Sequence, residues 1–190
     1  MERYSDREYT PDFDAAENER ANEPRSQLAR EMARNLHKLM KATEPPVDIN
    51  EVARLRKLLI VSVDLESKLS GALYPDRREI VVNTRGRSKG RQRFTIAHEL
   101  GHWELRHWQS GDLPDDTLGY SGIYEGDGSS EGRSAVEKEA NVFAAELLMP
   151  SKWIRKISKP LPDGAPQELA SLYQVSKEAM FYQLIRCGRI

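Results

Sequence analysis

The chain has 190 residues, of which 38% are hydrophobic, so it can bury one core and does not require several domains. Its 29 basic and 30 acidic residues leave a formal net charge of −1, which excludes a strong overall attraction to nucleic acid or to an anionic membrane. A single cysteine, Cys187, excludes an internal disulfide, and the N-terminus lacks the apolar run of a secretory signal. The longest apolar run, residues 58–63, is too short to span a bilayer. We therefore expect a cytoplasmic protein without a membrane span.

The first 25 residues combine eight acidic residues and four arginines with few aliphatic side chains. Such a segment has too little apolar surface to offset the entropy cost of ordering it. We therefore expect residues 1–25 to form a mobile acidic tail. Residues 26–157 are predicted to form the principal domain, and residues 158–190 a C-terminal helical pair packed on it.

Two helices followed by three strands are predicted in the first half of the domain. A helix is predicted from Ser26 until Pro45 and Pro46 end it, and a shorter helix follows Asp48. Three short apolar runs then read as strands, with turn residues between the last two that favour a hairpin: residues 57–65, 71–75 and 79–83. We expect a small three-stranded antiparallel sheet, followed by a basic run, residues 85–93, that reads as a solvated loop.

Three of the four histidines lie within fourteen consecutive residues, FTIAHELGHWELRH, inside a helix predicted over residues 91–107. His98 and His102 are four residues apart, so they share one helix face and can direct both imidazoles at one metal ion. Glu99 lies close to that face, where its carboxylate can act as a general base. Together these residues form an H-E-x-x-H pattern, which is typical of zinc hydrolases.

The surroundings of the two histidines support a metal site over a chance pairing. Residues 94–97 are largely apolar, and burying two unpaired histidines in such a helix would be costly. Gly101 costs about 1 kcal/mol in a helix interior, which suggests close packing beside the metal. His107 lies five residues beyond His102, too far round the helix to join the same ion. We expect it to satisfy the helix C-terminus or to contact a ligating histidine.

A catalytic zinc needs a third protein ligand, and the predicted helix at residues 134–148 offers Glu137, Glu139 and Glu146. Periodicity alone does not choose between them. Glu137 could instead cap its own helix through the pattern S-x-x-E. However, Asn141 follows Glu137 by four residues, where its amide could hold the outer nitrogen of a ligating histidine. Glu137 is therefore the preferred ligand, with Glu139 the next candidate.

A glycine-rich segment, residues 109–133, separates the two helices and shows no helical or strand period. Loops of this length are usually binding segments or lids, or are simply disordered, and the position between two ligand-bearing helices favours the first. Its Tyr120 and Tyr124, together with His107, are candidate donors to an oxyanion. Cys187 could in principle be a metal ligand, as in peptide deformylases, but it lacks the glycine-rich cysteine segment of that family.

The strings RFTIAHELGHWELRH and EKEANVFAAELLMP resemble the ImmA/IrrE family of metallo-endopeptidases, and the match extends over roughly residues 28–157. The resemblance implies a mostly helical α+β fold of the minimal, gluzincin-like zinc-peptidase type. It implies zinc held by His98, His102 and Glu137, with Glu99 as the catalytic base. Members are typically paired with a helix-turn-helix repressor, or an antitoxin-like regulator, which they cleave or inactivate. Manganese or another divalent metal also suits such ligands.

Two other functions compete with the peptidase. A zinc-stabilised module could bind and sequester a regulator without cutting it, although a structural site has no use for Glu99. The C-terminal residues 168–188 resemble a helix-turn-helix, but the second helix has only a weak basic face. We therefore expect this pair to complete the core, and we do not expect direct DNA binding.

Overall fold

The computed structural model describes residues 24–67, 69–109 and 135–190, and every structural statement below concerns these ranges. Within them the chain is mostly helical with one small sheet, which confirms the predicted α+β class. No helix in these ranges has the length and apolar character needed to cross a membrane. The elements in chain order are α2 (Ser26–Leu39), α3 (Ile49–Leu55), β1 (Leu59–Val63), β2 (Gly71–Tyr74), β3 (Glu79–Asn83), α4 (Lys89–Glu104), the 3-10 turn η1 (His107–Gln109), α5 (Ala135–Leu148), α6 (Ser151–Ile154), α7 (Ala165–Tyr173) and α8 (Lys177–Arg186).

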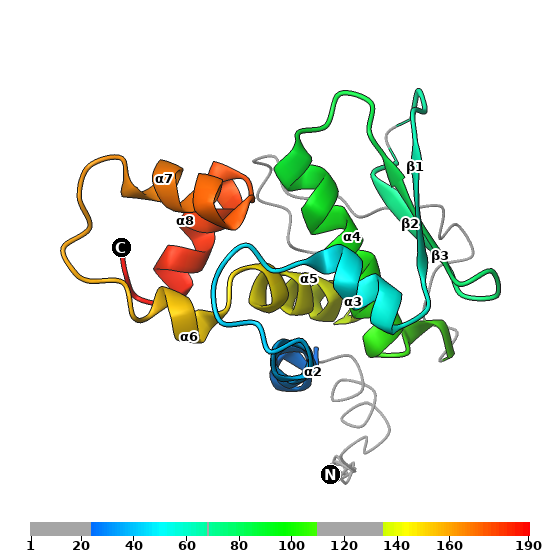
Figure 1. The fold of residues 1–190 in the computed structure, drawn as a ribbon, viewed down its shortest axis with the longest axis horizontal. Coiled ribbons are helices and arrows are strands. Elements are labelled where there is room, and N and C mark those ends of the chain that lie inside the picture. The colour runs from blue at the N-terminus through cyan, green and yellow to red at the C-terminus, as the bar shows by residue number, and fades with distance from the viewer. Residues whose placement is uncertain (1–23, 68, 110–134) are drawn as a thin grey trace, which may run out of the picture.

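Helix α4 is the centre of the fold (Figure 1). One side of it packs on strands β2 and β3, and another side packs on α5. Helix α2 covers α5, while α7 and α8 pack on each other at the far end of the molecule from the sheet. The largest fully buried side chains come from most of these elements and include Leu36, Ile80, Leu100, Phe143, Leu147 and Leu184. One core therefore reaches from the sheet to the C-terminal helices α7 and α8.

The sheet has the order β1–β3–β2, so it is mixed rather than antiparallel as the sequence suggested. The predicted hairpin is present, since β2 and β3 are antiparallel neighbours. Strand β1, however, pairs with β3 in parallel, with Ile60 opposite Ile80. After β1 the chain reverses direction and forms β2 at the opposite edge of the sheet. It then reverses again, and β3 lies between β1 and β2. Apolar runs identify strands but carry no information about this order, which explains the error.

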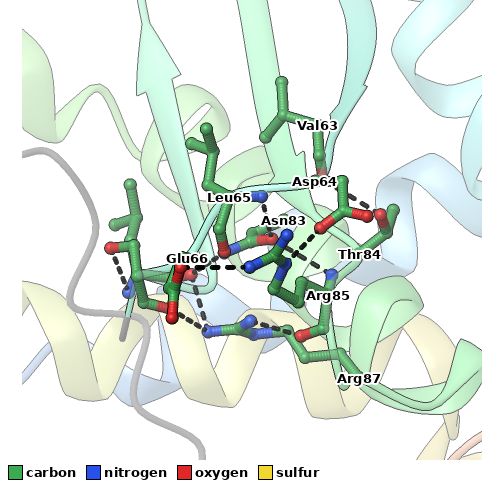
Figure 2. A network of polar contacts seen from close by, with 10 residues as sticks. Val63, Asp64, Leu65, Glu66, Asn83, Thr84, Arg85 and Arg87 are labelled. Carbon is green, nitrogen blue, oxygen red and sulfur yellow. Dashed lines mark hydrogen bonds and ion pairs between the residues drawn. The ribbon is translucent and has the colours of Figure 1, made fainter.

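A polar network secures the loop that leads from β1 into β2 (Figure 2). The buried amide of Asn83, at the end of β3, accepts from the backbone N–H of Leu65 and donates to the carbonyls of Leu65 and Leu69. Arg87 donates to the same Leu69 carbonyl at 2.7 Å, and Arg85 pairs with Asp64 at 2.6 Å. These two arginines of the basic run therefore brace the sheet.

Helix α4 begins two residues before the predicted start and ends three residues before the predicted end. The Ser88 hydroxyl caps its first turn by accepting from the backbone N–H of Arg91. At the other end, Arg106 adopts a left-handed conformation with φ of 57°, which stops the helix and reverses the chain. As a result His107 lies on the short turn η1 and folds back toward α4.

Candidate metal centre

The side chains of His98, His102 and Glu137 converge between α4 and α5. The two Nε2 atoms of the histidines lie 3.0 Å apart. The Glu137 carboxylate faces both, with one oxygen 3.2 Å from His98 Nε2 and the other 3.2 Å from His102 Nε2. One ligand atom from each residue lies within 4.8 Å of the others. Two imidazole nitrogens and a carboxylate are therefore directed at one point.

Close packing of the two helices makes this convergence possible. A Cβ atom added at Gly101 would lie 3.1 Å from the Cα of Ala140 and 3.1 Å from Cδ1 of Phe143. The absence of a side chain at Gly101 thus lets α5 approach α4 beside His102. The predicted reason for this glycine, close packing next to the two histidines, is confirmed.

The outer nitrogens of both histidines have partners. His98 Nδ1 lies 3.1 Å from the Oδ1 oxygen of Asn141, which can only accept, so His98 donates from Nδ1 and keeps a lone pair on Nε2. His102 Nδ1 lies 2.9 Å from Nδ1 of His107. Asn141 therefore contacts the outer nitrogen of His98, and His107 contacts that of His102.

The three candidate glutamates of α5 have different surroundings. Only Glu137 reaches the histidine pair. Glu139 is buried and receives hydrogen bonds from His107 and from Arg25. Glu146 accepts from Arg34 at 2.9 Å and from the Ser151 hydroxyl. The geometry therefore favours Glu137 as the third ligand.

The electrostatics of the cluster favour one positive charge at its centre. Burial acts against a charged His102 and lowers its pKa to about 4, despite the opposing effect of Glu137. For His98 the carboxylates of Glu137 and Glu99 outweigh burial and raise the pKa. Burial tends to raise the pKa of Glu137, but its hydrogen bonds to the two histidines lower it strongly. An ionised carboxylate and two imidazoles that would bind in their neutral forms are a donor set that suits a divalent cation.

Glu99 is only 5% exposed and lies on the side of α4 that meets the sheet. A Cβ atom added at Gly71, the first residue of β2, would lie 3.6 Å from Oε1 of Glu99 and 2.3 Å from Cγ2 of Thr95. The Glu99 carboxylate is therefore next to β2, which is an outer strand of the sheet. Its charge acts on His98, so Glu99 is electrostatically coupled to the cluster without being one of its three converging residues.

Some sequence-based assignments lie outside the described residues, namely Tyr120, Tyr124, the glycine-rich segment and the proposed cap Ser134. One contact was missed. Arg25 was assigned to the tail, yet its backbone N–H donates to Glu139 at 2.7 Å and its guanidinium donates to the same carboxylate at 2.8 Å. No local signal could have revealed this pair, because 114 residues separate its members.

An H-E-x-x-H helix packed on a second helix that supplies a carboxylate, with a small sheet alongside, defines the class of minimal metallopeptidase folds. The chain belongs to the peptidase M78 family, the IrrE N-terminal-like domain, whose model matches residues 53–184. The resemblance noted from the two sequence motifs is thereby confirmed.

Two relatives in this family are radiation response metalloproteases IrrE. The protein from Deinococcus radiodurans is 36% identical over 116 residues, which cover 60% of this chain and 33% of the relative. The protein from Deinococcus deserti is 38% identical over 118 residues, which cover 60% of this chain and 38% of that relative. The matched part of the chain thus spans 33% and 38% of the length of these two relatives.

Among solved structures, a Mycobacterium tuberculosis transcriptional regulator has a similar fold. The superposition has a TM-score of 0.56 at 17% identity and covers 83% of this chain and 46% of the regulator. At this identity the likeness concerns the fold alone.

Proposed function

We propose that the chain is a zinc-dependent endopeptidase. The observation that supports this most strongly is the convergence of His98, His102 and Glu137, together with the buried carboxylate of Glu99, whose charge acts on His98. The three converging side chains would hold the metal, and this would leave a coordination position open. Membership of the peptidase M78 family and the two IrrE relatives support the same reaction class.

A bound zinc ion would supply Lewis-acid chemistry, which activates a water molecule and polarises the scissile carbonyl. The chain's own contribution is the proton transfer. Glu99 accepts a proton from the attacking water, whose oxygen bonds to the carbonyl carbon, and delivers that proton to the amine as the peptide C–N bond breaks. Asn141 and His107 hold the two imidazoles with their Nε2 lone pairs directed inward.

The substrate would bind as an extended segment along β2. This strand is at the edge of the sheet, and its first residue, Gly71, adjoins the Glu99 carboxylate. Backbone hydrogen bonds to a sheet edge give affinity with little sequence selectivity. The resemblance to the ImmA/IrrE family suggests the protein class: a helix-turn-helix repressor or an antitoxin-like regulator in the cytoplasm.

The test is incubation of the purified, zinc-loaded protein with the helix-turn-helix regulator encoded nearest to it, with and without a chelator. We expect discrete fragments whose appearance stops when the metal is removed and resumes when zinc is restored. Mass spectrometry of the fragments identifies the cut site. A regulator that forms a stable complex and stays intact would instead favour a zinc-stabilised module that sequesters its partner.

A further inference from the structure

We infer that His107, Glu139 and Arg25 form a positioning relay that sets the orientation and tautomer of His102, and through it the affinity of the metal centre. The inference rests on the proposed role of His102 as a ligand. It adds three residues that do not themselves reach the metal. One of them, Arg25, precedes α2 and contacts Glu139, which is 114 residues away in the sequence.

Only one arrangement of protons satisfies this chain of contacts when His102 is a ligand. A ligating Nε2 must carry a lone pair, so the proton of neutral His102 is on Nδ1. Nδ1 of His107 lies 2.9 Å away and must accept this proton's hydrogen bond. His107 then carries its own proton on Nε2 and donates it to Oε2 of Glu139 at 3.0 Å.

Arg25 completes the relay by fixing the Glu139 carboxylate. Its backbone N–H donates to Oε1 at 2.7 Å, and its Nη2 donates to Oε2 at 2.8 Å. The Nε group lies 3.1 Å from both oxygens. A carboxylate held on both oxygens keeps its charge and its orientation, so it accepts from His107 in a single geometry.

Burial makes each contact of the relay difficult for water to replace. His102, His107 and Glu139 are 4%, 1% and 2% exposed, so water cannot readily replace a missing partner, and each lost contact leaves a buried polar atom unsatisfied. Hydrogen bonds to the outer nitrogen of a ligating histidine fix its ring and increase its basicity. The relay therefore favours metal binding at Nε2.

A comparable ion pair, Arg34 of α2 with Glu146 of α5, lies outside the relay. Glu146 of α5 is 1% exposed and is bonded to Arg34 of α2, just as Glu139 is bonded to Arg25 ahead of α2. The hydrogen bonds of Glu146 go to Arg34 and Ser151 rather than to a histidine of the centre. Substitutions in this pair should weaken packing between α2 and α5 without altering His102.

The experiment measures the zinc dissociation constant of the full chain by competition with a colorimetric chelator, and the melting temperature of the zinc-free protein. His107→Phe and Glu139→Gln should each raise the dissociation constant about 10- to 100-fold. Arg25→Ala should raise it by less, because the other contacts remain. His107→Asn, which retains an oxygen able to accept from His102, should recover part of the loss. Glu146→Gln and Arg34→Ala should lower the melting temperature while zinc affinity stays at the wild-type value.

Two results would overturn the relay while leaving the metal centre intact. In the first, the wild type binds zinc and the folded relay variants bind it equally well. In the second, the Glu146 and Arg34 variants lose as much affinity as the Glu139 and Arg25 variants, so that loosening of α5 explains the effect. If one relay variant does not fold, the zinc affinities of the remaining relay variants test the relay. A wild-type chain that binds no zinc would overturn the metal centre and the relay together.

Discussion

At the scale of single residues, the four histidines differ in the partner that each one contacts. His98 and His102 face each other and Glu137, and their outer nitrogens contact Asn141 and His107. His37 lies apart from them, donates to the carbonyl of Leu147 at 2.8 Å and stacks on Trp153. Histidine therefore contributes to the candidate metal centre in α4 and to core packing in α2.

Glu137→Ala tests the third ligand. Removing one of three protein ligands should raise the zinc dissociation constant at least about 100-fold, beyond the loss expected for a residue that only orients a ligand. Lys138→Ala is the control, because Lys138 is the exposed neighbour of Glu137 on α5. Zinc titrations of both variants give the answer. Unchanged affinity after Glu137→Ala would assign Glu137 to capping its helix.

The burial of His37 predicts a dependence of stability on pH. Burial is the main cause that lowers the pKa of His37 below 6.5, against the raising effect of its hydrogen bond to Leu147. The unfolded chain therefore takes up the proton first as pH falls below 6.5, and the folded state loses stability in that window.

The measurement is urea unfolding of the metal-free protein between pH 7.5 and about pH 5.5, around the ordinary histidine pKa. His37→Gln has no titrating group, so it should lose less stability than the wild type over this range. Contributions from the other histidines cancel in the comparison. Equal pH slopes would show that His37 is protonated equally readily in the folded and unfolded states.

The sequence identified most of the centre but left the choice of glutamate open. Glu137 and Glu139 lie on opposite flanks of one apolar stripe, so the hydrophobic period of α5 cannot separate them. The position of Asn141 four residues after Glu137 favoured Glu137 as the ligand, and the hydrogen bond between Asn141 and His98 agrees with that argument. Arg25 could not be found, because the relay joins segments far apart in the chain.

At the scale of elements, the approach of α4 to α5 determines whether the three ligands meet. Gly101→Ala adds a methyl group 3.1 Å from the Cα and 3.2 Å from the carbonyl oxygen of Ala140, backbone atoms that cannot move without α5. Alanine improves helix propensity by about 1 kcal/mol, but overpacking costs about 1–3 kcal/mol.

We therefore expect Gly101→Ala to lower both the melting temperature and the zinc affinity, since α5 would move outward with Glu137. Thermal unfolding with and without zinc measures both effects. A variant that is more stable than the wild type and binds zinc equally well would show that α5 shifts without cost, which would contradict the packing argument.

Element positions were easier to predict than their ends and their pairing. The helices and strands agree with the apolar periods and with local signals such as the Asp48 side chain, which caps α3 by accepting from Asn50. The sheet order was wrong because β1 pairs with a strand that is not next in sequence. The end of α4 was missed because the left-handed Arg106 is not a residue type that usually adopts this conformation.

At the scale of the whole molecule, the candidate metal centre lies between α4 and α5, where α4 also packs on the sheet and Arg25, just before α2, contacts Glu139 of α5. This arrangement connects the centre to the end of the acidic segment through Arg25.

Two truncations distinguish the contribution of residues 1–23 to stability and zinc binding from that of Arg25. Removing residues 1–23 should leave the melting temperature and zinc affinity unchanged, because that composition offers little apolar surface to pack. Removing residues 1–25 also deletes Arg25 and should weaken zinc binding. Calorimetry and zinc titration of both proteins test this. A large loss of stability with the shorter deletion would show that the acidic segment packs on the domain.

The most direct test of the peptidase proposal is Glu99→Gln in the zinc-loaded protein, assayed with its cognate regulator. Glutamine preserves the shape and a hydrogen-bonding oxygen but cannot act as a general base. Cleavage should therefore fall at least about 100-fold while zinc content and regulator binding persist. If the wild type binds the regulator without ever cutting it, and Glu99→Gln regulates equally well in cells, the peptidase account is contradicted.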